Sequence, residues 1–238
     1  MPPLRAISFD IGDTLVYDIP GVEDRVWSAA QTCGLTFDRD RLTAGLREAE
    51  TLALAEYLVG RPPETPDVQQ RMLREILAHT GGATPSEHAL AHFGAAFLDV
   101  PFTRVLQSRA LELLATLRSR GFLIGIVSDW EDTLEEMLRG MGVMDYAGAI
   151  AVSAIVGVTK PDPKLFRSIL TDLDVIAAEC LHVGDYLELD VHGAHAAGMN
   201  SLLFDWRRRA PSVDVLRVET FDCLCDVLLS LPAPTSAA

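Results

Sequence analysis

Short apolar runs rich in β-branched residues recur along the chain and predict buried strands. Five of them cover residues 5–10, 122–129, 148–155, 180–185 and 200–205. Each run is apolar almost without interruption, whereas a strand with one solvent-exposed face alternates apolar and polar residues. The runs therefore favour strands buried on both faces, as in a parallel sheet covered by helices.

Segments with the apolar periodicity of amphipathic helices lie between the later runs. They cover residues 105–121, 131–142, 161–173 and 189–199. Strand and helix therefore alternate from about residue 105 onward, which is typical of a doubly wound α/β fold. We predict a doubly wound parallel sheet with helices on its faces.

The chain between Val16 and Pro101 departs from this alternation. It lacks strand signals and predicts helices over residues 21–33, 39–60, 66–79 and 85–98. A structureless connection of that length would be unusual, so we expect an inserted helical domain. The expected division is a core of residues 1–16 and 101–238 and a helical domain of residues 17–100.

Composition excludes several classes of partner. The chain has 238 residues, 49% of them hydrophobic, and a formal net charge of −14. Such an acidic chain is a poor match for nucleic-acid phosphates or an anionic membrane surface. No apolar run approaches the roughly 18 residues that a membrane-spanning helix needs. The basic run from Trp206 to Arg209 is short, and we interpret it as a solvated loop.

The cysteines and the N-terminus indicate a compartment. The four cysteines lack the spacing of a zinc site, which favours free thiols in a reducing environment. The first residues carry no secretory pattern. We therefore expect a cytoplasmic protein without nucleic-acid or membrane partners.

Polar residues follow the first two runs at the positions where parallel strands form a ligand-binding crevice. Asp10 closes the first run, and its carboxylate is a candidate nucleophile or magnesium ligand, with a turn or Asx cap as the alternative. Ser128 and Asp129 close the second run, where a hydroxyl and helix N-terminal N–H groups could bind phosphate oxygens. Alternatively, Ser128 and Glu131 form a helix capping box.

Lys160 stands at a third junction, immediately before Pro161. Asp162 and Pro163 predict the N-cap and first residue of the next helix. A lysine fixed at this point could neutralise a phosphoryl group or keep a carboxylate ionised. The alternative is an ordinary solvated lysine.

Two acids follow the fourth run. Gly184 and Asp185 end it, and Asp190 comes five residues after Asp185. Two carboxylates leaving a buried strand suit a hard cation such as Mg²⁺, and the glycine permits a close approach. An acidic helix N-terminus is the alternative. For His182, as for the two histidines that follow it, we expect packing or surface roles.

The order and spacing of "FDIGDTL", "IVSDW", "KPDP" and "VGDYLELD" resemble the haloacid dehalogenase (HAD) superfamily over nearly the whole chain. The helical insertion is similar to the C1-type cap of that superfamily. The resemblance implies that Asp10 is a nucleophile that forms an aspartyl phosphate and that Lys160 stabilises charge. It further implies phosphate binding by Ser128, Asp129 and Lys160, and a Mg²⁺ site formed by Asp10, the Gly12 carbonyl, Asp185 and Asp190.

The first motif departs from the phosphatases of the superfamily, which read D-x-D-G-T. Gly12 stands where their second Asp protonates the leaving group and then activates water. Asp13 is one residue removed, and we do not expect it to take over, because proton transfer depends tightly on geometry.

Three functions are compatible with this departure. We favour a slow Mg²⁺-dependent phosphatase of a small phosphorylated metabolite. A dehalogenase-type hydrolase and a non-catalytic phosphate-binding or regulatory protein stay open. The sequence indicates neither the substrate nor the oligomeric state.

Overall fold

A computed structural model describes the chain except residues 1, 36–37, 64, 80–85, 211–213 and 235–238. By its internal contacts the chain divides into two units. One comprises Met1–Tyr17 and Val105–Ala238, and the other comprises Asp18–Arg104. No described helix is long and apolar enough to cross a membrane.

The larger unit contains a six-stranded sheet in the order β5-β4-β1-β6-β7-β8. Its strands are β1 (Ala6–Phe9), β4 (Leu123–Ser128), β5 (Ala149–Val152), β6 (Cys180–Gly184), β7 (Asn200–Phe204) and β8 (Arg217–Val218). Every neighbouring pair runs parallel. The predicted doubly wound parallel sheet is thus confirmed.

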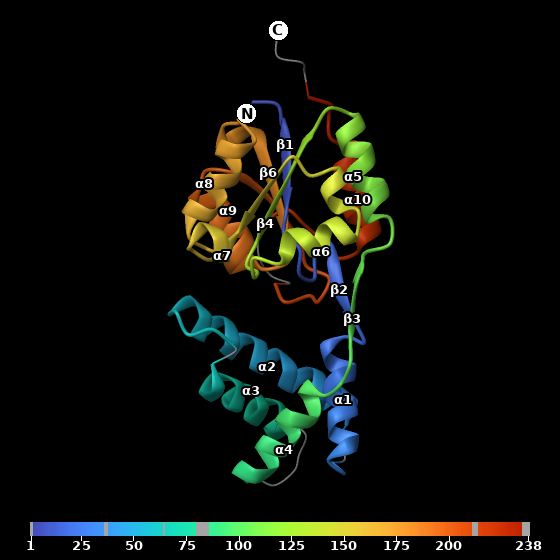
Figure 1. The fold of residues 1–238 in the computed structure, drawn as a ribbon, viewed down its shortest axis with the longest axis vertical. Helices are drawn as coiled ribbons and strands as arrows, with labels where there is room; N and C mark the ends of the chain where they lie inside the picture. The colour runs from blue at the N-terminus through green and yellow to red at the C-terminus, as the bar shows by residue number, and fades with distance from the viewer. Residues whose placement is uncertain (1, 36–37, 64, 80–85, 211–213, 235–238) are drawn as a thin grey trace. The chain divides into compact units, whose positions relative to one another are not determined.

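Helices cover both faces of this sheet (Figure 1). One face packs against α5 (Ala110–Ser119), α6 (Leu134–Gly140) and α10 (Phe221–Ser230), and the other against α8 (Pro163–Asp172) and α9 (His192–Ala196). Side chains alternate between the faces along β1, so Ile7 and Phe9 enter the first core and Ala6 the second. Burial on both faces explains why the strands lack polar alternation.

The smaller unit is helical. It consists of α1 (Val22–Thr32), α2 (Arg39–Leu58), α3 (Pro66–His79) and α4 (Glu87–Leu98), which share a core that includes Val26, Leu42 and Phe93. All four helices were expected, although residue 85, the predicted start of the last one, lies outside the described residues.

Several element boundaries differ from the sequence-based expectation. Two short strands, β2 (Val16–Ile19) and β3 (Thr103–Leu106), pair where the chain enters and leaves the helical unit. The helix expected over 105–121 begins later, at Ala110. Arg109, the residue before it, has a left-handed φ of 70°, which is incompatible with a right-handed helix.

Other boundaries differ in the second half of the chain. The expected strand over 148–155 ends at Val152 and continues as the short helix α7 (Ser153–Val156). The helix expected over 189–199 is a π-helical turn, Leu187–Val191, followed by α9. The strand β8 and the helix α10 have no counterpart in the prediction.

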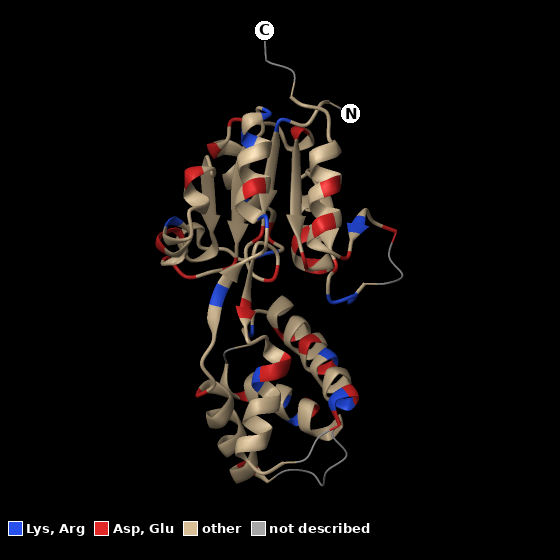
Figure 2. Cartoon of the chain, turned by 90° about the vertical axis from the view of Figure 1, so that its right-hand side faces the viewer, with Lys and Arg blue, Asp and Glu red and all other residues tan. Residues whose placement is uncertain are grey.

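Figure 2 shows the acidic residues spread over the helices of both units.

Candidate active site

The predicted chemical residues meet at the carboxyl edge of the sheet. Asp10 directly follows β1, Ser128 ends β4, and Asp185 directly follows β6. Since β4, β1 and β6 are parallel neighbours, their carboxyl ends lie at one edge. Lys160 reaches the same place from the segment between α7 and α8.

Lys160 lies between two buried acids. Its Nζ donates to Asp10 Oδ1 at 2.6 Å and to Asp190 Oδ1 at 2.6 Å. Burial alone would lower the pKa of Lys160, but attraction to the two carboxylates outweighs it, and the pKa is raised. The lysine is therefore a permanent cation, as a charge-stabilising residue must be.

The two acids respond in opposite directions. Burial raises the pKa of Asp10, and Lys160 only partly counteracts this effect. Burial would also raise the pKa of Asp190, but the charge of Lys160 and the hydrogen bond from His182 outweigh it, so the pKa is lowered. Asp190 is thus the firmly ionised member of the pair.

The second motif supports the same carboxylate. Ser128 Oγ donates to Asp10 Oδ1 at 3.1 Å, and both oxygens of Asp129 accept from the backbone N–H of Lys160 at 3.0 and 3.2 Å. The alternative capping box of Ser128 and Glu131 is wrong, because α6 begins only at Leu134 and Ser128 belongs to β4. Asp129 fixes the main chain that carries the lysine.

The third junction is built as expected. Asp162 is the N-cap of α8, where its carboxylate accepts from the N–H of Lys164 at 2.9 Å, and Pro163 is the first helical residue. Lys160 itself is only 4% exposed, which excludes the solvated alternative.

The fourth motif depends on a glycine. A Cβ on Gly184 would lie 2.2 Å from Cγ of Asp190, so only glycine lets this acid fold back over the strand end. The other oxygen of Asp190, Oδ2, accepts from the N–H of Tyr186 at 2.9 Å. Both oxygens of Asp190 are thereby hydrogen-bonded within the protein.

A chain of buried polar groups behind Asp190 was not predicted. His182 Nε2 lies 3.2 Å from Asp190 Oδ1, and its Nδ1 lies 3.0 Å from Ser8 Oγ. Because ionised Asp190 can only accept, we assign the proton to Nε2 and the donor role to Ser8. His182 packs against the edge of Phe166, and burial lowers its pKa. The sequence contains a signal for this chain of groups, because Ser8 and His182 are polar residues inside otherwise apolar strands.

Two arginines also join the site, contrary to the interpretation of the basic run as a solvated loop. Arg209 Nη1 donates to Asp185 Oδ2 at 2.9 Å, and Arg207 Nη2 donates to Asp13 Oδ2 at 2.7 Å. Burial raises the pKa of Asp185 well above its ordinary value, although Arg209 acts in the opposite direction. Only Arg208 of the three keeps a largely exposed side chain.

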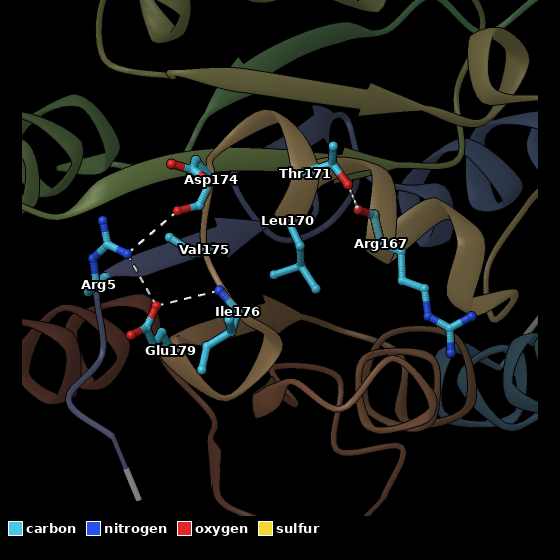
Figure 3. A pocket seen from close by; sticks show the side chains of 8 residues that line it. All are labelled: Arg5, Arg167, Leu170, Thr171, Asp174, Val175, Ile176 and Glu179. Atoms are coloured by element: carbon cyan, nitrogen blue, oxygen red, sulfur yellow. Dashed lines mark hydrogen bonds and ion pairs between the residues drawn. The ribbon is translucent and has the colours of Figure 1, made fainter.

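A separate cavity of about 680 Å³ lies elsewhere on this unit (Figure 3). Its lining includes Arg5, which precedes β1, and Glu179, which precedes β6. These positions mark the amino edge of the sheet, opposite the strand ends that carry Asp10 and Asp185. The cavity is therefore separate from the candidate active site.

Comparison with known proteins agrees with this arrangement. The family model for haloacid dehalogenase-like hydrolases matches residues 4–198, which include all the motif residues described above. The chain belongs to the haloacid dehalogenase-like hydrolases. It is accordingly a HAD-superfamily hydrolase with an α/β core.

Several HAD relatives are phosphatases. The chain is 29% identical to the phosphoserine phosphatase of Thermus thermophilus, over 85% of this chain and 89% of that protein. It is 30% identical to the ribulose-1,5-bisphosphate 5-phosphatase of Halopiger xanaduensis, over 84% of each. The fold is similar to that of the HAD hydrolase YfnB from Bacillus subtilis, solved with bound magnesium. That match has a TM-score of 0.66 and 19% identity, and it covers 95% of this chain and 99% of YfnB.

The resemblance to HAD phosphatases implies a Mg²⁺ ion, and the donor set fits one. No group of three His, Cys, Asp or Glu side chains gathers as a metal cluster among the described residues. However, Mg²⁺ is commonly held by only one or two carboxylates and keeps several waters. Asp10, Asp185 and the Gly12 carbonyl supply oxygen donors of that kind. Asp190, the fourth predicted ligand, has both carboxylate oxygens in hydrogen bonds with Lys160 and the N–H of Tyr186, and its role at a metal stays a prediction. Mutual repulsion of the buried acids, which helps to raise the pKa of Asp185, favours a cation among them.

Proposed function

We propose that this protein is a Mg²⁺-dependent phosphatase that acts on a small phosphorylated metabolite through an aspartyl phosphate on Asp10. The observation that carries the proposal is the buried Asp10 carboxylate, which Lys160 and Ser128 both contact through Oδ1. These contacts orient Oδ2 as the attacking oxygen. The phosphatases among its relatives support a phosphorylated substrate.

The chemistry follows from the positions of these side chains. An Asp10 oxygen attacks phosphorus, and the bond to the leaving oxygen breaks with both electrons going to that oxygen. Lys160 and Ser128 offer donors to the charged phosphoryl oxygens. Water then attacks the aspartyl phosphate, which returns the Asp10 carboxylate and releases phosphate. Bound Mg²⁺ would supply additional stabilisation of negative charge, held by Asp10, Asp185 and the Gly12 carbonyl.

The proton steps lack a dedicated residue. Gly12 has no side chain, and Asp13 is ion-paired with Arg207. Loss of a general acid/base typically costs about 10²–10⁴ in rate. We therefore propose a preference for leaving groups that depart as stable anions, such as those of acyl and aryl phosphates. We propose that the helical unit is a C1-type cap and determines which substrate the protein accepts.

The test is hydrolysis of p-nitrophenyl phosphate and acetyl phosphate with and without Mg²⁺. Wild type should show slow, Mg²⁺-dependent turnover, and Asp10→Asn should show none. Gly12→Asp should be faster on p-nitrophenyl phosphate by about 10²-fold. The Cβ of the new side chain fits, because it would lie 3.7 Å from Trp130 Cζ3, an ordinary van der Waals contact.

Controls separate the alternatives. Circular dichroism should show that Asp10→Asn is folded. Phosphate binding without turnover by wild type would contradict the phosphatase and favour a binding protein. A gain in Gly12→Asp that persists in the double variant with Asp10→Asn would contradict the nucleophile.

A dehalogenase-type hydrolase is the second candidate. Two observations favour it: a leaving halide needs no proton, so the absence of a side chain at Gly12 has no cost, and Arg209 gives Asp185 a counter-ion from within the protein. In that reaction an Asp10 oxygen would displace halide from carbon, and water would hydrolyse the resulting ester. Metal-independent chloride release from 2-chloropropionate, absent in Asp10→Asn, would establish it.

A further inference from the structure

The segment that follows β7 has a fixed backbone. Asp205, which is 2% exposed, accepts from the N–H groups of Arg209 at 2.7 Å and Ala210 at 3.2 Å. It also accepts from Arg217 Nη1 at 3.1 Å. These three hydrogen bonds satisfy the buried acid and stabilise the turn that carries the arginines.

Three consecutive arginines leave this turn toward different surroundings. Arg209 contacts Asp185 at 2.9 Å and lies over the ring of Tyr186, with 4.1 Å between the guanidinium carbon and the ring centroid. Arg207 contacts Asp13 in the first motif, whereas Arg208 pairs with Glu219 and is 71% exposed. Arg209 therefore contacts a residue that belongs to the proposed metal site, namely Asp185.

The Asp185 carboxylate is 4% exposed, so it depends on a compensating cation. Arg209 provides that charge through Oδ2. A divalent cation bound to Asp185 would stand next to the guanidinium, and in a site shielded from water the repulsion between them is large. Arg209 and a divalent cation therefore cannot both bind Asp185 as strongly as each would bind alone.

We propose that Arg209 competes with the divalent cation for Asp185, so that the Arg209–Asp185 ion pair occupies the metal-free site and metal binding requires the release of Arg209. The inference rests on the proposed function, because it takes Asp185 as a metal ligand. Arg209 is here a regulatory counter-ion and takes no part in the chemical step. The site accordingly binds the metal less tightly than the same carboxylates would without the charge of Arg209.

The experiment is calorimetric titration of the full chain, treated with EDTA and dialysed, with MgCl₂ and separately with MnCl₂. Arg209→Gln should bind each metal about tenfold more tightly than wild type, since one repelling charge near the ion is removed. Arg208→Gln is the matched control from the same turn and should equal wild type. Arg207→Gln should have an intermediate effect, because its charge lies near the site on Asp13.

A second measurement keeps the test valid if Arg209→Gln is less stable. Arg209→Lys retains a charge, and its affinity should stay within about twofold of wild type. Thermal unfolding should show a larger Mg²⁺-induced rise in Tm for Arg209→Gln than for wild type. Equal or weaker metal binding by Arg209→Gln, or the same gain in Arg208→Gln, would overturn the inference.

The outcomes are separable from those of the proposed function. Tighter metal binding by Arg209→Gln without phosphate ester hydrolysis would support the competition and contradict the phosphatase. Mg²⁺-dependent hydrolysis with unchanged affinity in Arg209→Gln would support the phosphatase and overturn the competition.

Discussion

Two buried acids of this molecule meet a cation in different ways. At Asp190 the cation is Lys160, which also contacts Asp10, and further donors from His182 and Tyr186 complete the carboxylate. At Asp185 the cation is Arg209, which donates a hydrogen bond from a turn that follows another strand. We call the first arrangement closed, because both carboxylate oxygens of Asp190 accept hydrogen bonds, whereas the second depends on the guanidinium of Arg209.

The pKa directions express this difference. The pKa of Asp190 is lowered, because its cation and donors outweigh burial, whereas the pKa of Asp185 is raised, because burial and neighbouring acids outweigh Arg209. A satisfied carboxylate gives rigidity, and an under-compensated one gives affinity for a cation. The same edge of the sheet thus holds two buried acids, five residues apart, whose pKa values are shifted in opposite directions.

The strongest test of the closed arrangement is Lys160→Met. Removing the shared cation leaves two acids buried without compensation, which should lower the free energy of unfolding by about 3–5 kcal/mol. Urea unfolding followed by circular dichroism measures this loss. Lys164→Met, an exposed lysine on the neighbouring helix, is the control and should change little. A loss confined to activity, with wild-type stability, would show that Lys160 is not the charge that holds the acids.

The residues at the strand ends could be predicted because their signal is local. Asp10, Ser128 and Asp185 each sit directly at the end of an apolar run, and parallel strands bring such ends together whatever the intervening sequence. The adjacent residues Asp162 and Pro163 likewise predicted the start of α8.

The arginines could not be predicted because their surroundings depend on distant chain segments. The run contains three consecutive arginines with different surroundings. Arg207 contacts a residue 194 positions away, Arg208 lies at the surface, and Arg209 contacts Asp185. His182 is similar, since its partner Ser8 lies 174 positions away on an adjacent strand. The short strands β2 and β3 were missed because four residues give too little periodicity.

A comparison of two glycines sharpens the contrast at Asp190. Gly184→Ala would place a Cβ 2.2 Å from Asp190 Cγ and should cost about 1–3 kcal/mol, since the acid must leave its donors. Gly12→Ala is the matched control, because its Cβ meets only Trp130 at 3.7 Å, and its stability should stay near that of wild type. Both are measured by urea unfolding. Equal losses in the two variants would mean that Asp190 is not tightly held.

The smallest expected effect concerns the histidine behind Asp190. Burial lowers the pKa of folded His182 below the ordinary 6.5, so on acidification the unfolded state takes up a proton before the folded state does. The stability that this histidine contributes is therefore present above pH 6.5 and is lost as pH falls, by up to about 1.4 kcal/mol per pH unit.

Urea unfolding of wild type and His182→Gln between pH 8 and pH 5 isolates this contribution. Asp10 and Asp185, whose pKa values are raised, act in the opposite direction, but they are common to both proteins and cancel in the difference. The two curves should converge as pH falls, because only wild type carries the histidine whose pKa is lowered in the fold. Parallel curves for His182→Gln would mean that folding leaves the pKa of this histidine unchanged, whereas curves that diverge as pH falls would mean that the folded histidine is protonated and adds a second cation at Asp190.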